Sequence, residues 1–235
     1  MKRISYIANQ LYPEGLDELQ LLLICRQYGL HAALSGPPGT GKTECVRQVA
    51  KVLEAPLFAK TCSARTAESQ IISYPALERD GEATVTVYRN GPLVQAMEAG
   101  GIFYADEFNL LKEDVQKRLN SATDDRRSID RIDGVVVQAT EGFWTTISYN
   151  PSRSITSRDL EESVADRFVH LNFRAWDAGF LGFVSQQRTA RLRNGELPSP
   201  RLTGLSLGTR AFSGDGRFLD LRRDGAGTRW YDSLA

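Results

Sequence analysis

One short stretch, GPPGTGKT from Gly36 to Thr43, constrains this chain more than any other. It matches the pattern G-x-x-x-x-G-K-[ST] and follows the apolar run HAALS. After it, the apolar residues from Val46 to Leu53 recur at helical spacing, which predicts an amphipathic helix. A strand, a glycine-rich turn and a helix in this order form the context in which backbone N–H groups bind phosphate. The alternative is a glycine-rich turn that holds no ligand.

The residues of this turn are candidate ligands of a nucleotide. Glycines allow consecutive backbone N–H groups to point inward, and the following helix adds the positive end of its dipole. Lys42 would supply positive charge to the β- and γ-phosphates of ATP, and Thr43 a hydroxyl to Mg²⁺, which prefers oxygen ligands. The candidate nucleotide-binding residues of the turn are Gly36, Pro37, Pro38, Gly39, Thr40, Gly41, Lys42 and Thr43.

Two acidic residues follow a second apolar run. In GIFYADE, four apolar or small residues predict a buried strand that ends at Asp106 and Glu107. Asp106 would hold a magnesium-bound water, and Glu107 would orient or deprotonate the attacking water. Thr43 and Asp106 are therefore the candidate metal ligands. The alternative is a helix N-cap followed by a first-turn acid.

An amide and an arginine complete the set of candidate catalytic residues. ISYNPS places Asn150 at the end of another strand, where it would hydrogen-bond the attacking water or the γ-phosphate. A simple Asn-Pro turn is the alternative. In DLEESVADRF, Arg167 lies between a short predicted helix and a strand. It is either a surface ion-pair partner or an arginine that reaches the ATP of a neighbouring subunit.

Strand-like runs alternate with helical periodicity through the first three quarters of the chain. This pattern predicts an α/β fold, a P-loop NTPase whose parallel sheet is flanked by helices. ATVTVYRNGP predicts a β excursion, and the Asp-Gly pair of SIDRIDGVVVQA is typical of a hairpin. The predicted sheet strands span 31–35, 56–62, 101–107, 143–151 and 167–173, and the predicted helices lie around 16–23, 46–53, 92–100, 111–119 and 159–166.

The composition changes from about Trp176. Helical periodicity persists weakly to Arg193, after which Gly, Pro, Ser and Arg dominate. We therefore expect a nucleotide-binding α/β core over residues 1–175 and a lid-like, partly irregular region over 176–235. That region has many arginines and no lysine, which would suit an anionic partner or reflect coding bias.

Composition excludes several classes of protein. The 29 Lys and Arg equal the 29 Asp and Glu, so the net charge gives no steering toward nucleic acid or an anionic membrane. Cys25, Cys45 and Cys62 are odd in number and widely spaced, which favours reduced, buried thiols over disulfides or a zinc site. The most apolar run, 19–25, is far shorter than a membrane span of roughly 20 residues. Since a secretory signal pattern is also absent, we expect a soluble cytoplasmic protein.

In this order, GPPGTGKT, GIFYADEFN, ISYNP and ESVADRF resemble the motifs of AAA+ ATPases, and more narrowly those of the MoxR branch with its CbbQ, NirQ, NorQ and GvpN-type members. The resemblance covers roughly residues 16–173. The roles that it implies are Lys42 and Thr43 as Walker A ligands, Asp106 and Glu107 as the Walker B pair, Asn150 as sensor 1 and Arg167 as an arginine finger acting in trans.

The resemblance also implies how such a protein works. These ATPases use ATP and Mg²⁺ and assemble into rings, usually hexamers, because the finger completes a site at a subunit interface. They remodel proteins together with a partner, often one bearing a von Willebrand factor A domain. The hairpin at 128–139 and the β excursion around 85–88 resemble family features that would face the pore or a partner.

The chain departs from the family pattern at its C-terminus. The family normally places a helical lid there, with a sensor 2 arginine. Arg210 in LGTRAF and Arg229 in GAGTRWYDSLA are the two candidates for that arginine. The resemblance therefore implies a short, atypical or truncated lid.

Three hypotheses about function remain. The first is an ATP-driven remodelling ATPase whose catalysis requires assembly, because the arginine finger comes from a neighbour. The second is a nucleotide-dependent interaction switch with little hydrolysis. The third is a nucleic-acid-associated motor subunit, against which the neutral net charge and the lack of a recognition motif argue.

Overall fold

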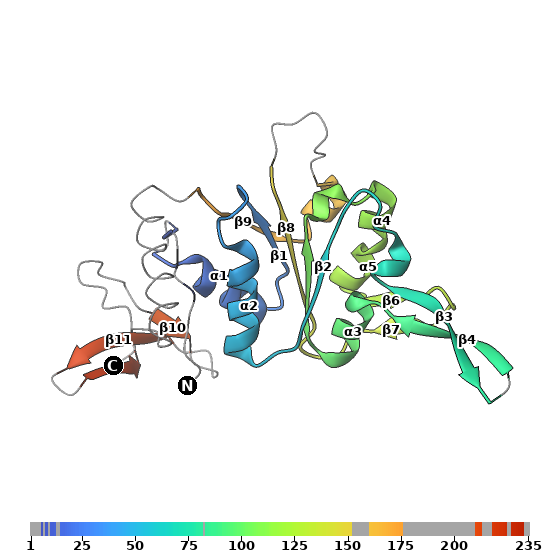
Figure 1. The fold of residues 1–235 in the computed structure, drawn as a ribbon. Helices are drawn as coiled ribbons and strands as arrows, with labels where there is room; N and C mark the ends of the chain where they lie inside the picture. Colours follow the sequence, from blue (N-terminus) through green and yellow to red (C-terminus); the bar gives the residue numbers. More distant parts are fainter. Residues whose placement is uncertain are drawn as a thin grey trace, which may run out of the picture.

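A five-stranded parallel sheet forms the centre of the protein in a computed structural model (Figure 1). The structure describes residues 6, 8, 10–12, 15–81, 83–151, 160–175, 210–212, 218–224 and 227–232. The strand order is β2-β5-β8-β1-β9, and each neighbouring pair is parallel. The strands are β1 (Ala32–Ser35), β2 (Leu57–Thr61), β5 (Ile102–Asp106), β8 (Trp144–Tyr149) and β9 (Val169–Asn172). The predicted parallel sheet is confirmed.

Strand order determines what surrounds the glycine-rich turn. β1 lies between β8 and β9, and Ser35 pairs with Tyr149 on one side and Asn172 on the other. Because parallel strands end at the same edge, the segments that follow β1, β5 and β8 emerge together. These segments contain three of the four motifs that the sequence singled out, and the fourth, with Arg167, precedes β9.

Helices cover both faces of this sheet (Figure 1). One face packs against α1 (Glu18–Gln27) and α2 (Lys42–Leu53). The other packs against α3 (Pro92–Ala99), α4 (Glu113–Arg118), α5 (Asn120–Thr123) and α6 (Glu162–Ala165). Two short 3₁₀ turns, η1 (Glu68–Gln70) and η2 (Phe108–Leu110), connect elements on the second face.

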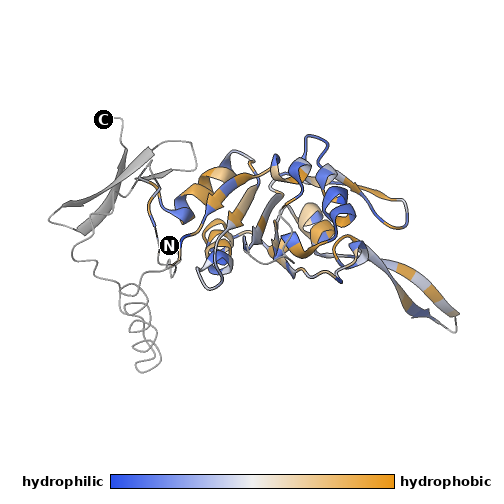
Figure 2. Cartoon of the chain, turned by 90° about the horizontal axis from the view of Figure 1, so that it is seen from above, coloured by the Kyte–Doolittle hydropathy of each residue, from blue (hydrophilic) through white to orange (hydrophobic). Residues whose placement is uncertain are grey.

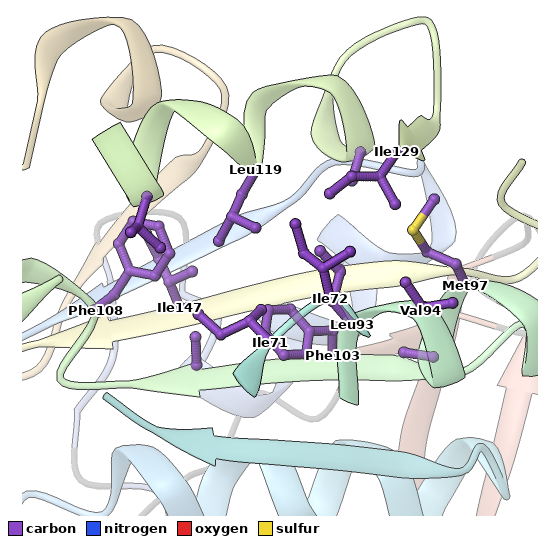
Figure 3. Packing of buried hydrophobic residues seen from close by; sticks show 14 of the residues in the cluster. Ile71, Ile72, Leu93, Val94, Met97, Phe103, Phe108, Leu119, Ile129 and Ile147 are labelled. Atoms are coloured by element: carbon purple, nitrogen blue, oxygen red, sulfur yellow. The ribbon is translucent and has the colours of Figure 1, made fainter. Parts of the chain in front are cut away.

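The sheet separates two clusters of buried apolar side chains. On β5, Ile102 and Tyr104 belong to the cluster with α1 and α2, whereas Phe103 and Ala105 belong to the cluster on the opposite face. Figure 3 shows Phe103 of this second cluster among side chains from several other elements. Alternation of side chains along a strand, with both faces covered, explains why GIFYA reads as a continuous apolar run.

The three cysteines are buried, as expected. Burial raises the pKa of the Cys25 thiol to about 11 and that of Cys62 to about 12. Burial also raises the pKa of Cys45. All three side chains therefore remain protonated at neutral pH, and they pack as small apolar groups.

Two antiparallel hairpins lie beside each other, away from α1 and α2 (Figure 1). They are β3 (Ser73–Asp80) with β4 (Ala83–Asn90), and β6 (Ser128–Asp130) with β7 (Val136–Gln138). Arg131, between β6 and β7, donates to Asn90 Oδ1 over 3.0 Å, and Ile132 N donates to Ser73 Oγ over 3.0 Å. The hairpins are therefore connected by side chains. Figure 2 shows the β3–β4 hairpin projecting from the body with apolar residues along it.

The predicted β excursion at 83–92 and hairpin at 128–139 are confirmed, but the sequence did not predict strand β3. The segment SYPALERD has no apolar alternation, because most of its side chains on both faces of the hairpin are exposed to solvent. The predicted helix with Leu111, Val115 and Leu119 is divided into α4 and α5, and Leu111 precedes both. These three leucine and valine side chains are still buried.

The described C-terminal residues form strands. β10 (Arg210–Phe212), β11 (Phe218–Asp224) and β12 (Gly227–Asp232) make a three-stranded antiparallel sheet in the order β10-β11-β12. The two sensor 2 candidates thus lie on strands rather than on the helices of a family-type lid. The helical periodicity from 176 to 193 lies outside the described residues, and the boundary at 175/176 stays a prediction.

Candidate active site

The turn after β1 is shaped by close backbone packing. Gly36 has a φ of +144°, and a Cβ atom at this position would lie 2.2 Å from the carbonyl oxygen of Phe173. The Phe173 N–H in turn donates to Ser35 O over 2.7 Å, which holds the end of β9 against the turn. Gly41 has a φ of +90°, in the left-handed region that favours glycine. These two positions therefore require glycine for different reasons.

The remaining residues of the turn form an open tip and a helix start. Pro37, Pro38 and Gly39 are exposed, and Thr40 Oγ1 donates to Pro37 O over 2.9 Å, which closes the loop. α2 begins at Lys42, and no side chain caps its N-terminus. Its first N–H groups are therefore left for a ligand, and the helix dipole favours an anionic one.

Lys42 is 7% exposed, and its ammonium group is fully engaged. Nζ donates to Gly36 O over 2.7 Å, to Pro37 O over 2.9 Å and to Asn150 Oδ1 over 2.9 Å. Burial lowers the pKa of Lys42, while the nearby Asp106 carboxylate acts in the opposite direction. The lysine thus connects the glycine-rich turn directly to the end of β8.

Thr43 and Asp106, the two predicted metal ligands, lie together. Thr43 Oγ1 is 3.4 Å from Asp106 Oδ2, so the first turn of α2 meets the end of β5. Both groups offer oxygen ligands, which suit a hard cation such as Mg²⁺. The described residues contain no group of three His, Cys, Asp or Glu side chains that would hold a metal by itself. A cation here would rest on these two side chains and on the phosphates of a nucleotide.

Two further residues, Tyr104 and Ser148, orient these ligands. The Tyr104 hydroxyl lies 3.1 Å from Thr43 Oγ1 and donates to Ser148 Oγ over 2.9 Å. Ser148 Oγ donates to Asp106 Oδ1. Burial raises the pKa of Tyr104 to about 12, so the phenol keeps its proton. The sequence analysis did not single out either residue. A hydroxyl-bearing side chain within each of two buried strands could have indicated a polar contact near the site.

Glu107 follows β5 in an unusual backbone conformation. Its φ of 56° lies in the left-handed region, which non-glycine residues seldom adopt. Glu107 itself occupies the N-cap position of η2, its side chain makes no capping hydrogen bond, and the first turn of η2 contains no acid. The alternative of a helix N-cap followed by a first-turn acid is therefore wrong. Its N–H donates to Asp106 Oδ1 over 3.1 Å. Within the described part of the chain, its carboxylate makes no hydrogen bond or ion pair.

Asn150 lies directly after β8, as predicted, and reaches the turn through Lys42. Arg167 lies between α6 and β9 and does not join this group. Its guanidinium donates to Ser163 O, and its buried Nε has no partner among the described residues. Among the described residues its guanidinium makes no ion pair with an acid, and both alternatives for its role, a surface ion-pair partner and a finger toward a neighbouring subunit, stay predictions.

The parallel sheet, the glycine-rich turn and the acids at the end of the adjacent strand define a P-loop NTPase fold. The dynein-related subfamily of AAA domains matches residues 31–168, and the chain belongs to this family. In the part of the chain that the structure describes, no helix is long and apolar enough to cross a lipid bilayer.

Similar proteins place the chain within the family. The denitrification regulatory protein NirQ of Pseudomonas aeruginosa is 30% identical over 191 residues, which are 80% of this chain and 68% of that protein. Protein NorQ of Paracoccus denitrificans is 36% identical over 163 residues, 68% of this chain and 58% of that protein. The chain thus spans only part of each relative. The predicted resemblance to NirQ and NorQ-type members of the MoxR branch is confirmed.

A solved structure supports the fold. A provisionally named ATPase from Cytophaga hutchinsonii superposes with a TM-score of 0.60 at 20% identity. The match covers 76% of this chain and 51% of that one. At this identity the likeness shows a common fold, and the chemistry must be argued from the side chains of the present chain.

Proposed function

We propose that this protein binds ATP with Mg²⁺ and hydrolyses it. One observation carries the proposal: the lysine and threonine of the glycine-rich turn meet Asp106 and Asn150 from two other strands. A turn without a ligand has no need of these converging groups. The buried lysine, the uncapped helix N-terminus and the paired oxygen ligands together suit a triphosphate and its cation.

Each side chain has a separate task in this reaction. Lys42 exchanges its carbonyl and amide acceptors for phosphate oxygens and neutralises their charge. Water attacks the γ-phosphorus, the bond from that phosphorus to the β,γ-bridging oxygen breaks, and the water proton passes to Glu107. Asn150, released from Lys42, hydrogen-bonds the attacking water or the γ-phosphate. Thr43 and Asp106 would hold Mg²⁺, which, when bound, supplies further charge neutralisation at the phosphates.

Arg167 acts in this proposal on the ATP of a neighbouring copy. Within its own chain it contacts Ser163 rather than the turn, and its Nε is left without a partner among the described residues. If Arg167 of one subunit completes the site of the next subunit, the protein must assemble into a homo-oligomeric ring. Arginine fingers contribute roughly 10³ to 10⁵ in rate. Hydrolysis should therefore depend on assembly.

The test is phosphate release over a range of protein concentrations. We expect the specific rate to rise with concentration, and Glu107→Gln to bind ATP but lose at least about 10²-fold in rate, the contribution typical of a general base. Glu44→Gln is a matched control, because Glu44 is an exposed acid on α2 whose ion-pair partner among the described residues is Arg47. If wild type and Glu107→Gln release phosphate at equal rates, the proposed catalytic role is wrong. ATP binding without turnover at any concentration would instead favour a nucleotide switch.

The purpose of hydrolysis is proposed from the relatives. NirQ is named as a regulatory protein of denitrification. We infer that the present chain uses ATP to remodel or activate a protein target, with a partner of the von Willebrand factor A type. Partner binding should change the rate of phosphate release in the wild type. A partner that binds without altering that rate in any nucleotide state would contradict a remodelling role.

A further inference from the structure

A groove of about 370 Å³ lies at the opposite edge of the central sheet from the glycine-rich turn. It is lined by the end of α1, by Arg127 before β6, and by residues 141–143 before β8. These segments precede strands, whereas the candidate active site follows strands. The groove is therefore separate from the nucleotide site.

Two half-buried arginines converge on this groove. Arg26, in the last turn of α1, donates through Nη2 to Gly142 O. Arg127 donates through Nη2 to Thr140 O over 3.3 Å. Both therefore hold the loop before β8, which gives them a structural role. Each guanidinium carries five N–H donors, so one bond to a carbonyl leaves most of its donor capacity unused.

No carboxylate neutralises these two cations in the part of the chain that the structure describes. By contrast, Arg118, Arg126 and Arg131 each form an ion pair with an acidic side chain. Glu141 is exposed at the groove but pairs with neither arginine. Arg26 Nε is buried and has no hydrogen-bond partner among the described residues. Like charges held together in a partly buried place are unfavourable unless an anion joins them.

Burial and the uncompensated positive charge together lower the pKa values of two groups at the groove, Arg26 and His31. Burial lowers the pKa of Arg26, and the charge of Arg127 lowers it further. His31 lies beneath the groove, with its ring 6.1 Å from that of Phe143. Burial lowers the pKa of His31 to about 4, and Arg127 and Arg26 contribute to the decrease. Its Nδ1 accepts from Thr145 N over 3.0 Å, so the neutral ring is the form that fits.

We propose that Arg26 and Arg127 form a binding site for an oxyanion, a carboxylate or a phosphate group, at the amino-terminal edge of the sheet. Planar guanidinium groups bind both anions through paired N–H donors. The anion satisfies donors that the loop carbonyls do not reach, and it joins α1 to the segment that leads into the β6–β7 hairpin. An acidic side chain of a partner protein and a free phosphate compound share this chemistry.

The test uses His31 as a reporter by NMR. The chain has two histidines, so a His170→Gln variant assigns the His31 ring signals. Inorganic phosphate and N-acetylaspartate are titrated separately at constant ionic strength. A Lys42→Ala background removes phosphate binding at the glycine-rich turn. We expect a saturable shift of the His31 signals with a dissociation constant of about 1–10 mM, as a few charge-assisted hydrogen bonds would give. Tighter binding of N-acetylaspartate would indicate an acidic side chain of a partner protein as the ligand, and tighter binding of phosphate would indicate a free phosphate compound.

Four variants distinguish a specific binding site from nonspecific attraction of anions by positive charge. Arg127→Gln should weaken binding at least about tenfold, because the fork of donors is lost. Arg126→Gln removes an adjacent exposed arginine that is paired with Asp124 and should change nothing. Glu141→Gln should tighten binding, because it removes a repelling charge. Arg26→Gln provides a second test if Arg127→Gln does not melt cooperatively. No saturable shift with either anion, or equal shifts in the arginine variants and wild type, would overturn the proposal.

Discussion

Lys42 Nζ donates a hydrogen bond to Asn150 Oδ1 across 2.9 Å, which joins the glycine-rich turn to the end of β8. The same ammonium group donates to the carbonyl oxygens of Gly36 and Pro37. Its three protons are therefore all engaged before any phosphate arrives. Under the proposed function, a nucleotide would displace these acceptors, and the displacement would release Asn150. Binding of a nucleotide to the turn and the position of Asn150 would then be coupled by this exchange.

The coupling predicts opposite effects of two substitutions. Asn150→Ala should bind ADP about fivefold more tightly, because removal of a competing hydrogen bond favours phosphate by roughly 1 kcal/mol. Asn150→Asp should bind ADP more weakly, because a carboxylate holds Lys42 more strongly. Isothermal titration calorimetry measures both constants. Weaker ADP binding by Asn150→Ala would contradict the exchange, whatever its effect on hydrolysis.

The hydroxyl of Ser148 should affect the use of magnesium. Ser148→Ala removes the donor to Asp106, and loss of such supporting groups typically weakens metal binding by about 10- to 100-fold. We expect the Mg²⁺ concentration for half-maximal phosphate release to rise by about tenfold. Thr146→Val is the matched control, because Thr146 lies on the same strand and its buried hydroxyl has no partner among the described residues. Equal magnesium dependence in both variants would argue against this role of Ser148.

Two glycines of the turn should differ in their tolerance of alanine. Gly36→Ala places a methyl group 2.2 Å from a backbone oxygen, so we expect a loss of about 3 kcal/mol in the free energy of unfolding. Gly39 has a φ of +79° but open space around it. Gly39→Ala should therefore cost only the backbone strain of about 1 kcal/mol. Urea unfolding compares them, and equal losses would show that β9 does not restrict the turn.

His31 should make stability depend on pH. Its pKa falls from an ordinary value of 6.5 to about 4 in the folded protein, so the unfolded chain binds more protons between these values. The stabilisation is complete above pH 6.5 and is lost as pH falls toward 4, amounting to about 3 kcal/mol. His31→Gln should flatten this profile. Urea unfolding of both proteins at pH 7 and pH 5 measures the difference, and parallel profiles would contradict the prediction.

The sequence predicted most of the candidate site because its motifs are local. Lys42 and Thr43 stand within one short pattern, and Asp106, Glu107 and Asn150 end apolar runs that had to be strands. Parallel pairing then brings these ends together without further information. Arg167 was located correctly in the chain, but its role depends on a second copy, and one chain does not test it.

Other features depend on contacts that the sequence does not display. Tyr104 and Ser148 resemble ordinary core residues until β5 is seen beside β8. Strand β3 was missed because an exposed hairpin needs no apolar face. Arg26 and Arg127 are far apart in the chain, and only the loop before β8 brings them to one groove.

The position of β1 in the sheet has a consequence for synthesis of the protein. Ala32 pairs with Thr146 on one side and Val169 on the other, both more than a hundred residues later in the chain. On the ribosome, the first strand therefore waits without a partner until most of the domain has emerged, and such long-range pairing is slow. The turn that follows it becomes fixed only at that stage. Nucleotide capture would thus report that a nascent chain has finished folding.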